Sequence, residues 1–264
     1  MKRFILLITT ACFICSCSVR NISTKSFSSL KEQNLKGPVR QFEQKTYSIN
    51  SFTNELIEDT CCINRNTFDK KGRNIKQETL NNKAELRTLV IQSFYKNGLI
   101  KDGKHFNGNG ILTYREEFEL DEKGLYKGGT AWREEGKVYR YFKILKQTEF
   151  GSWSILQWYT PEMKLMQTQT STFEGNKLLK QVWENADGKI ARNQTAVYNE
   201  KGDRIEMAVS AIVPGAVAGK DSTRLQNSRF RYDEYDKYGN WIQRSTLDKD
   251  GKISRVAKRT FIYS

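Results

Sequence analysis

The residues in this sequence best suited to chemistry are carboxylates that precede a glycine at short spacing. Residues 248–251 read Asp-Lys-Asp-Gly, and two aspartates at this spacing before a glycine can act as calcium ligands. In a twelve-residue calcium loop, Thr246 and Ala257 would take the first and last positions, where the essential carboxylates belong. Because both carboxylates are missing, we predict no metal site here and no cofactor.

Other catalytic arrangements lack partners in the sequence. His105 is the only histidine, which excludes zinc sites built from several histidines. No Gly-x-Ser-x-Gly segment supplies a nucleophile for it, and we expect His105 to lie in a loop. The adjacent glutamates at 116–117 and 134–135 would point to opposite faces of a strand, so neither pair can flank one glycosidic bond. We therefore predict no catalytic residues.

The Asp-x-x-Gly pattern recurs along the chain, and it predicts hairpin turns. An aromatic or apolar residue precedes Asp or Asn, which bonds to nearby backbone, and the final Gly adopts the left-handed conformation that closes the turn. The expected turn residues are Asp69 and Gly72; Asp121 and Gly124; Asn199 and Gly202; Tyr235, Asp236, Gly239 and Asn240; and Asp248 and Gly251.

The spacing of the glycines predicts the fold. Gly72, Gly98 and Gly124 lie 26 positions apart, and four further pairs of turn glycines lie 12 to 14 positions apart, at 124 and 136, 175 and 188, 188 and 202, and 239 and 251. The shorter spacing suits one strand with its turn, and the longer one suits a hairpin. We predict an all-β fold, an antiparallel meander of repeated β-hairpins that forms a long, strongly twisted or curled sheet.

Residues 230–242 resemble the YD repeat of Rhs-type proteins, in which Tyr-Asp is followed by two residues, Gly and often Asn. The chain is most similar to short exported bacterial lipoproteins with degenerate YD repeats, which often open on Gly-Pro-Val, as at 37–39, and close on a strand, as at 261–263. The regular spacing of the turns extends over residues 37–264, but only residues 235–241 match the YD motif well. The resemblance implies a hairpin-repeat fold. It does not imply a toxin shell, because the chain is short and has no distinct C-terminal effector.

The N-terminus predicts export and a lipid anchor. Lys2 and Arg3 precede an apolar stretch at 4–8, as in a secretion signal. Residues 14–17, Ile-Cys-Ser-Cys, resemble a bacterial lipobox and make Cys17 the expected lipidation site. Cys12 is a weaker candidate, and an ordinary cleaved signal peptide is the alternative. We divide the chain into a lipoprotein signal peptide (1–16), a flexible tether (17–36) and a β-hairpin repeat domain (37–264).

The cysteines left after removal of the signal and lipidation are Cys61 and Cys62. Neighbouring side chains on a strand point to opposite faces, so we expect two unlinked thiols rather than a vicinal disulfide.

Charge and aromatic content indicate the kind of partner. The formal net charge is +14, which favours anionic surroundings. The basic residues alternate with apolar ones instead of clustering, so we expect no nucleic acid partner. Trp132, Trp158 and Trp241 are the candidate binding aromatics, because exposed rings beside basic residues suit sugars and protein partners. The uncharged apolar segment 207–219 is either a partner-binding or membrane-touching loop or a strand and turn packed under the sheet.

Two functions from different classes fit these features. The first is a non-catalytic, lipid-anchored envelope protein that recognises a glycan or protein partner through a β-sheet face. The second is an immunity or antitoxin-like protein that neutralises a partner protein, and a glycan-active enzyme comes third. Ser18 replaces the Asp linked with inner-membrane retention, and residues 19–21 lack an acidic surface-export cluster, so we expect an anchor in the outer membrane, on its periplasmic face.

Overall fold

All the strands that the structure describes belong to one antiparallel sheet. The structure is a computed structural model, and it describes residues 29–264 except 51, 54, 134–135, 149–151 and 214–221. The elements are α1 (Ser29–Glu32), β1 (Val39–Ile49), β2 (Leu56–Glu58), β3 (Cys61–Phe68), β4 (Asn74–Asn81), β5 (Leu86–Phe94), β6 (Ile100–Asn107), β7 (Leu112–Leu120), β8 (Tyr126–Arg133), β9 (Val138–Gln147), β10 (Trp153–Tyr159), β11 (Leu165–Glu174), β12 (Lys177–Asn185), β13 (Ile190–Tyr198), β14 (Arg204–Val213), β15 (Ser222–Tyr235), β16 (Trp241–Leu247) and β17 (Ile253–Tyr263).

The sheet closes into a barrel. From β3 to β17 each strand pairs with the next, and β1 pairs with both β3 and β17, so 16 strands form the closed wall. The short β2 pairs only with the end of β1. At the closure, Phe42 on β1 lies opposite Phe261 on β17. The predicted antiparallel meander is confirmed. The prediction of a long curled sheet is corrected, because the sheet closes on itself. The turn pattern is local and carries no information on pairing between the first strand and the last.

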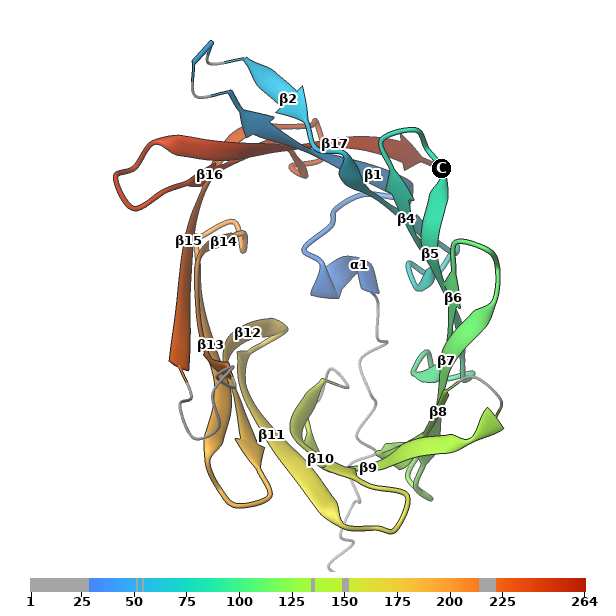
Figure 1. Ribbon diagram of the computed structural model, residues 1–264. Coiled ribbons are helices and arrows are strands. Elements are labelled where there is room, and N and C mark those ends of the chain that lie inside the picture. The colour runs from blue at the N-terminus through green and yellow to red at the C-terminus, as the bar shows by residue number, and fades with distance from the viewer. Residues whose placement is uncertain (1–28, 51, 54, 134–135, 149–151, 214–221) are drawn as a thin grey trace, which may run out of the picture.

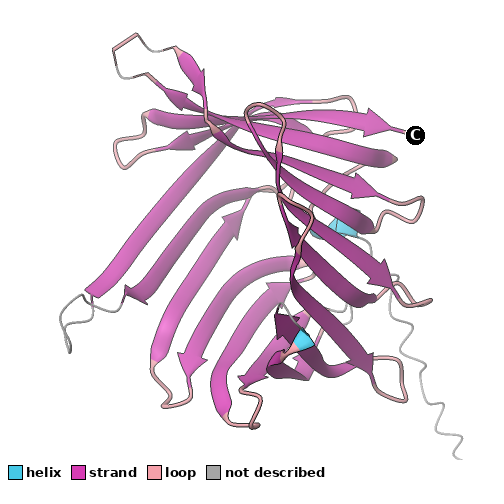
Figure 2. Ribbon diagram, turned by 45° about the vertical axis from the view of Figure 1, so that its right-hand side comes forward, coloured by secondary structure: helices cyan, strands magenta, loops and turns pink. Residues whose placement is uncertain are grey.

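The expected turn residues close hairpins. The N–H of Gly72 donates to the Asp69 carbonyl at 3.0 Å, and the Asp69 carboxylate accepts from two backbone N–H groups of the same turn. The five expected turn glycines have φ between 74° and 83°, in the left-handed region. Figure 2 shows loops at both ends of the strands. Since successive strands alternate in direction, four of these turns share one rim and only the turn at 248–251 lies at the other.

A segment from Ser29 to Lys36, which includes α1, lies inside the barrel (Figure 1). We call it the N-terminal strap, and we call the rim that it contacts the strap rim. It was expected to belong to the flexible tether, but it is bonded to turns around that rim. Leu30 N–H donates to the Gly72 carbonyl at 3.2 Å, and Lys36 N–H donates to Asn240 Oδ1 at 2.7 Å. The packed part of the chain therefore begins before Gly37.

Contacts with the strap identify which face of the barrel wall is the inner one. Leu35 of the strap packs with Phe42 and Phe68, so these rings point inward, and side chains in register with them do the same. A second inner cluster, around Leu99, Phe118, Phe142 and Leu156, lies on the opposite side of the barrel, between β6 and β10. Apolar side chains of these two clusters therefore line part of the inner face.

Three expectations about single segments change. Cys61 and Cys62 form a vicinal disulfide instead of remaining unlinked, because a bulge in β3 and a positive φ of 84° at Cys62 disturb the usual alternation of side chains. His105 lies in β6, not in a loop. Of the apolar segment 207–219, residues 207–213 belong to β14, which pairs with β13 and β15. Residues 214–219 lie outside the described residues, as do the signal peptide and Cys17.

Among the residues that the structure describes, no helix has the length and apolar character required to cross a membrane.

Candidate functional site

A cavity of about 320 Å³ lies between the strap and the wall formed by β12 to β17. Three arginines line it, Arg204 from β14, Arg244 from β16 and Arg259 from β17. Tyr232 and Trp241 supply aromatic surface, and Asn34 of the strap closes one side. We call this space the arginine cavity.

Sheet register brings the arginines together. Arg244 pairs with Tyr232 on one side and with Ala257 on the other, so all three side chains share the inner face. Arg259 is two positions beyond Ala257 on β17 and therefore points the same way, diagonally beside Arg244. Arg204 enters from β14, where it pairs with Tyr198 after a bulge. These side chains are distant in sequence and meet only because the strands pair in this register.

Among the described residues that line the arginine cavity, only Asp203 carries a carboxylate, and this carboxylate accepts its hydrogen bonds from groups other than the arginines. Asp203 is buried and accepts hydrogen bonds from Asn34 Nδ2 at 2.8 Å and from the Tyr235 hydroxyl at 2.9 Å. None of the ion pairs found within the described ranges involves Arg204, Arg244 or Arg259. The cavity therefore carries an excess of positive charge.

Two of the guanidinium groups also have unused donors. Within the part of the chain that the structure describes, Nε of Arg204 and Nε of Arg244 are buried without a hydrogen-bond partner, whereas Nε of Arg259 donates to Gln44 Oε1 at 3.1 Å. A buried donor without a partner is costly unless a ligand or water occupies it. Arginine presents five N–H donors in a fork that matches a carboxylate or phosphate.

Aromatic rings hold the guanidinium groups without occupying their N–H donors. Arg259 lies over Trp241 and Phe42, with its guanidinium carbon 3.7 Å and 4.6 Å from the ring centroids. Arg244 lies over Phe230 at 4.4 Å and over Trp241 at 4.9 Å. Such cation–π contacts fix the plane of a guanidinium while its edge stays available for hydrogen bonds.

Burial and mutual repulsion affect the charge of these arginines. Burial, with the positive charge of Arg244 nearby, lowers the pKa of Arg259 to about 9. Burial also lowers the pKa of Arg244. With a pKa of about 9, Arg259 still carries its charge at neutral pH. An anion placed between the guanidinium groups of Arg244 and Arg259 would offset their mutual repulsion. The electrostatics of the cavity therefore favour a negatively charged ligand.

A second polar cluster lies on the inner face of β6, β7 and β9. The Tyr114 hydroxyl donates to Glu116 Oε2 at 3.2 Å and accepts from Arg140 Nη2 at 3.2 Å. Burial raises the pKa of Glu116, against the opposing effects of Tyr114 and Arg140. The ring of His105 meets Tyr114 edge-on, and burial lowers the pKa of His105. Glu117 points outward, where it pairs with Arg115, so Glu116 and Glu117 do not form a facing pair.

The structure separates the three tryptophans that the sequence singled out. Trp241 lines the arginine cavity. Trp158 is also on the inner face, where Arg140 stacks on it at 3.7 Å. Trp132 lies on the outer face under Arg115, at 4.2 Å. They do not form one binding face. The sequence did not predict the three arginines of the cavity as site residues, because no local pattern distinguishes them from the many other basic strand residues.

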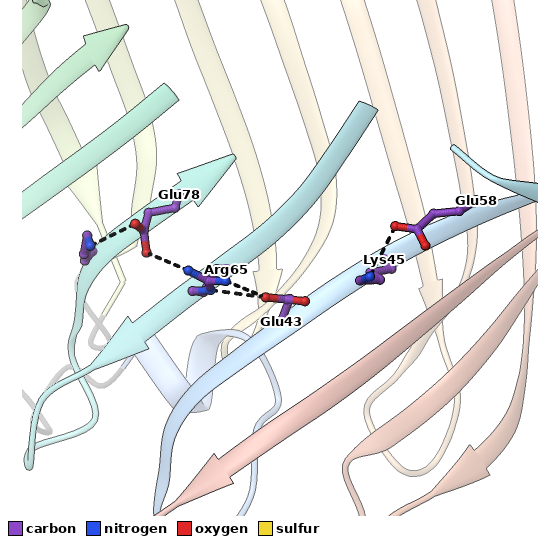
Figure 3. A network of polar contacts seen from close by, with 6 residues as sticks. Glu43, Lys45, Glu58, Arg65 and Glu78 are labelled. Carbon is purple, nitrogen blue, oxygen red and sulfur yellow. Dashed lines mark hydrogen bonds and ion pairs between the residues drawn. The ribbon is translucent and has the colours of Figure 1, made fainter. Parts of the chain in front are cut away.

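The outer face carries charge in the middle of its strands. On β3, Arg65 lies between Glu43 of β1 at 2.8 Å and Glu78 of β4 at 4.0 Å, as Figure 3 shows. Lys45 pairs with Glu58 at 3.3 Å on the same surface. Barrels that cross a membrane present an apolar outer band midway along their strands, and charged side chains there are destabilising. This part of the wall is suited to contact with water.

Within the described residues, no group of three or more His, Cys, Asp or Glu side chains is placed to hold a metal ion.

Comparison with known proteins supports the fold. No protein-family model matches the sequence, and no curated protein matches it. Among solved structures, a porin-like protein from Bacteroides uniformis is similar at a TM-score of 0.50 and 12% identity, over 86% of this chain and 98% of that one. A porin-like protein from Bacteroides vulgatus gives 0.31 at 9% identity, over 83% and 97% of the two chains.

A Tc holotoxin pore from Photorhabdus luminescens gives a TM-score of 0.30 at 11% identity, over 77% of this chain but 12% of that one. At 12% identity, the likeness to the Bacteroides uniformis protein concerns the fold alone. The chain is a 16-strand β-barrel similar in fold to that porin-like protein.

Proposed function

We propose that this chain is a non-catalytic, lipid-anchored binding protein of the bacterial cell envelope, which holds an anionic glycan in the arginine cavity. The observation that carries the proposal is the set of three guanidinium groups around one cavity, in which the carboxylate of Asp203 is bonded to Asn34 and Tyr235 instead. Hydrogen bonds between charged donors and acceptors are the strong ones, and arginine is suited to bidentate recognition of anions.

The sequence and the outer face together support the proposed anchor and location. The lipobox-like residues 14–17 support lipidation at Cys17, and the YD-like segment supports assignment to the short exported lipoproteins that carry such repeats. Charged residues such as Arg65 and Glu78 on the outer face favour a barrel that is held at a membrane and surrounded by water. We place it on the periplasmic face of the outer membrane.

The test is glycan binding by the protein purified from membranes in detergent. We expect acidic polysaccharides to bind and neutral ones to bind weakly. Replacing both Arg244 and Arg259 with Gln should weaken acidic-glycan binding at least tenfold, since a hydrogen bond to a charged group contributes about 1.5–3 kcal/mol. Arg115→Gln is the matched control, because Arg115 also stacks on a tryptophan but on the outer face.

Failure of acidic polysaccharides to bind would overturn the proposal, and so would either of two further results. One is acidic-glycan binding that the double arginine variant leaves unchanged. The other is affinity capture from the native envelope that yields a single stoichiometric protein and no polysaccharide, which is the result expected of an antitoxin-like protein that neutralises a partner. Hydrolysis of a bound glycan would contradict the non-catalytic assignment.

A further inference from the structure

A second cavity adjoins the arginine cavity. It has a volume of about 450 Å³ and lies between β10, β11 and β12 on the inner face. Asn176 and Tyr198 line both cavities, so the two spaces meet at these side chains. Tyr198 is held in place by its hydroxyl, which donates to the Leu178 carbonyl at 3.1 Å.

The two cavities differ in charge. Every described polar side chain that lines the second one is neutral, and the amides Gln169 and Gln181 share this lining with the rings of Tyr126 and Trp153. Amides can donate and accept at once, and aromatic faces cover apolar surface. Together they suit a ligand that has hydroxyl groups at its edge and apolar C–H groups on its face. A neutral sugar ring has this chemistry.

The amides are oriented by the wall and keep bonding capacity. Nε2 of Gln181 donates to Ser171 Oγ at 3.1 Å, and Nε2 of Gln169 reaches the same oxygen at 3.4 Å. A side-chain amide can make four hydrogen bonds, and the bond to Ser171 uses one of them. Both side chains are therefore positioned before a ligand arrives, which lowers the entropic cost of binding.

We infer that the ligand is an acidic oligosaccharide of at least two units, with its acidic sugar at Arg244 and Arg259 and a neutral sugar beside Gln181. The inference rests on the proposed function and adds the second subsite. The acidic unit supplies most of the charge-dependent affinity. The neutral unit, reached past Tyr198, supplies selectivity for chain length.

Calorimetric titration of the detergent-purified protein tests the second subsite. The probes are glucuronic acid and a disaccharide of glucuronic acid linked to a neutral hexose. We expect the disaccharide to bind at least about tenfold more tightly than glucuronic acid. Gln181→Leu should remove this gain while leaving the affinity for glucuronic acid unchanged. Gln157→Leu, on the outer face of β10, is the matched control and should retain the gain.

The outcomes separate the two proposals. If both probes bind wild-type protein equally well, the second subsite is wrong and the arginine site stands. If Gln181→Leu keeps the full gain, the neutral sugar lies elsewhere and the inference is wrong. If neither probe binds and acidic polysaccharides also fail to bind, the proposed function itself has failed.

Discussion

The guanidinium group of Arg259 lies against the ring of Trp241, with 3.7 Å between its central carbon and the ring centroid. Trp241 is only 6% exposed, so this contact joins the apolar interior to the charged cavity. The ring excludes water from one face of the guanidinium, while Nε at its edge donates to Gln44 Oε1 at 3.1 Å. A change at Trp241 should therefore affect both stability and ligand binding.

Trp241→Ala should lower the free energy of unfolding by about 3 kcal/mol, because it leaves a large cavity in a buried region. It should also weaken acidic-glycan binding, since Arg259 loses its support. Denaturant unfolding and calorimetry measure the two effects. Trp132→Ala, which removes a ring from the outer face, should cost less stability and leave binding unchanged. Equal losses for the two variants would contradict this assignment.

Glu116→Gln should alter how stability depends on pH. The pKa of Glu116 is raised above its ordinary value of 4.5, so the folded protein binds the proton more tightly than the unfolded chain does. The wild-type protein therefore loses stability as pH rises above 4.5 toward the raised folded-state pKa. A glutamine side chain keeps an acceptor for the Tyr114 hydroxyl without the buried charge.

We expect Glu116→Gln to be more stable than wild type at pH 7, with the difference vanishing below about pH 4.5. Thermal unfolding across that range measures it. Glu117→Gln, on the outer face, should keep the wild-type pH dependence. A Glu116→Gln variant less stable than wild type at pH 7 would show that the carboxylate is favourable where it lies.

Asn240→Ala should release the N-terminal strap. Asn240 is buried and makes two hydrogen bonds with the backbone of Lys36, one in each direction, at 2.7 and 2.8 Å. Losing them should cost about 2 kcal/mol and increase amide hydrogen exchange in the strap. Lys252 follows the glycine of the turn at the other rim, so Lys252→Ala is the matched control. Unchanged exchange in Asn240→Ala would mean that other contacts hold the strap.

Gly129→Ala should destabilise the barrel. Gly129 lies on the inner face between Phe118 and Phe142, and an added methyl group would collide with the Glu117 backbone and the Phe142 ring. Forcing such a group into a packed site costs about 1–3 kcal/mol. Thr130→Ala, on the outer face of the same strand, should change stability by less than about 0.5 kcal/mol. Chemical denaturation compares the two.

Reduction of the Cys61–Cys62 disulfide should leave the unfolding midpoint almost unchanged. A disulfide stabilises a fold mainly by closing a long loop in the unfolded chain, and adjacent residues close none. Thermal unfolding with and without a reducing agent measures this, and mass spectrometry verifies the state of the thiols. A large drop in the midpoint would assign the pair a structural role.

Local features of the fold were predictable from the sequence because they depend on local chemistry. The turn at Asp69 and Gly72 could be located, since an Asx bond and a left-handed glycine leave a recognisable pattern. Barrel closure could not be located. It depends on pairs such as Phe42 and Phe261, whose residue types also suit any strand.

The candidate site was less predictable than the fold. Trp241 was singled out for its aromatic character, but Arg244 and Arg259 were not, because their proximity depends on the register of β16 and β17. The strap was missed for a similar reason. Polar residues such as Asn34 resemble a flexible linker in sequence, and only their partners on distant turns reveal that they are packed.

The pairing of β1 with β17 has a consequence for the order of folding. Gln44 and Arg259, which bond across that seam, are 215 residues apart, so the seam cannot form until the last strand has been made. Until then β1 and the growing end of the sheet both have exposed edges that can pair with other chains. We therefore expect the interval before closure to be the one in which unpaired strand edges make this protein most vulnerable to aggregation.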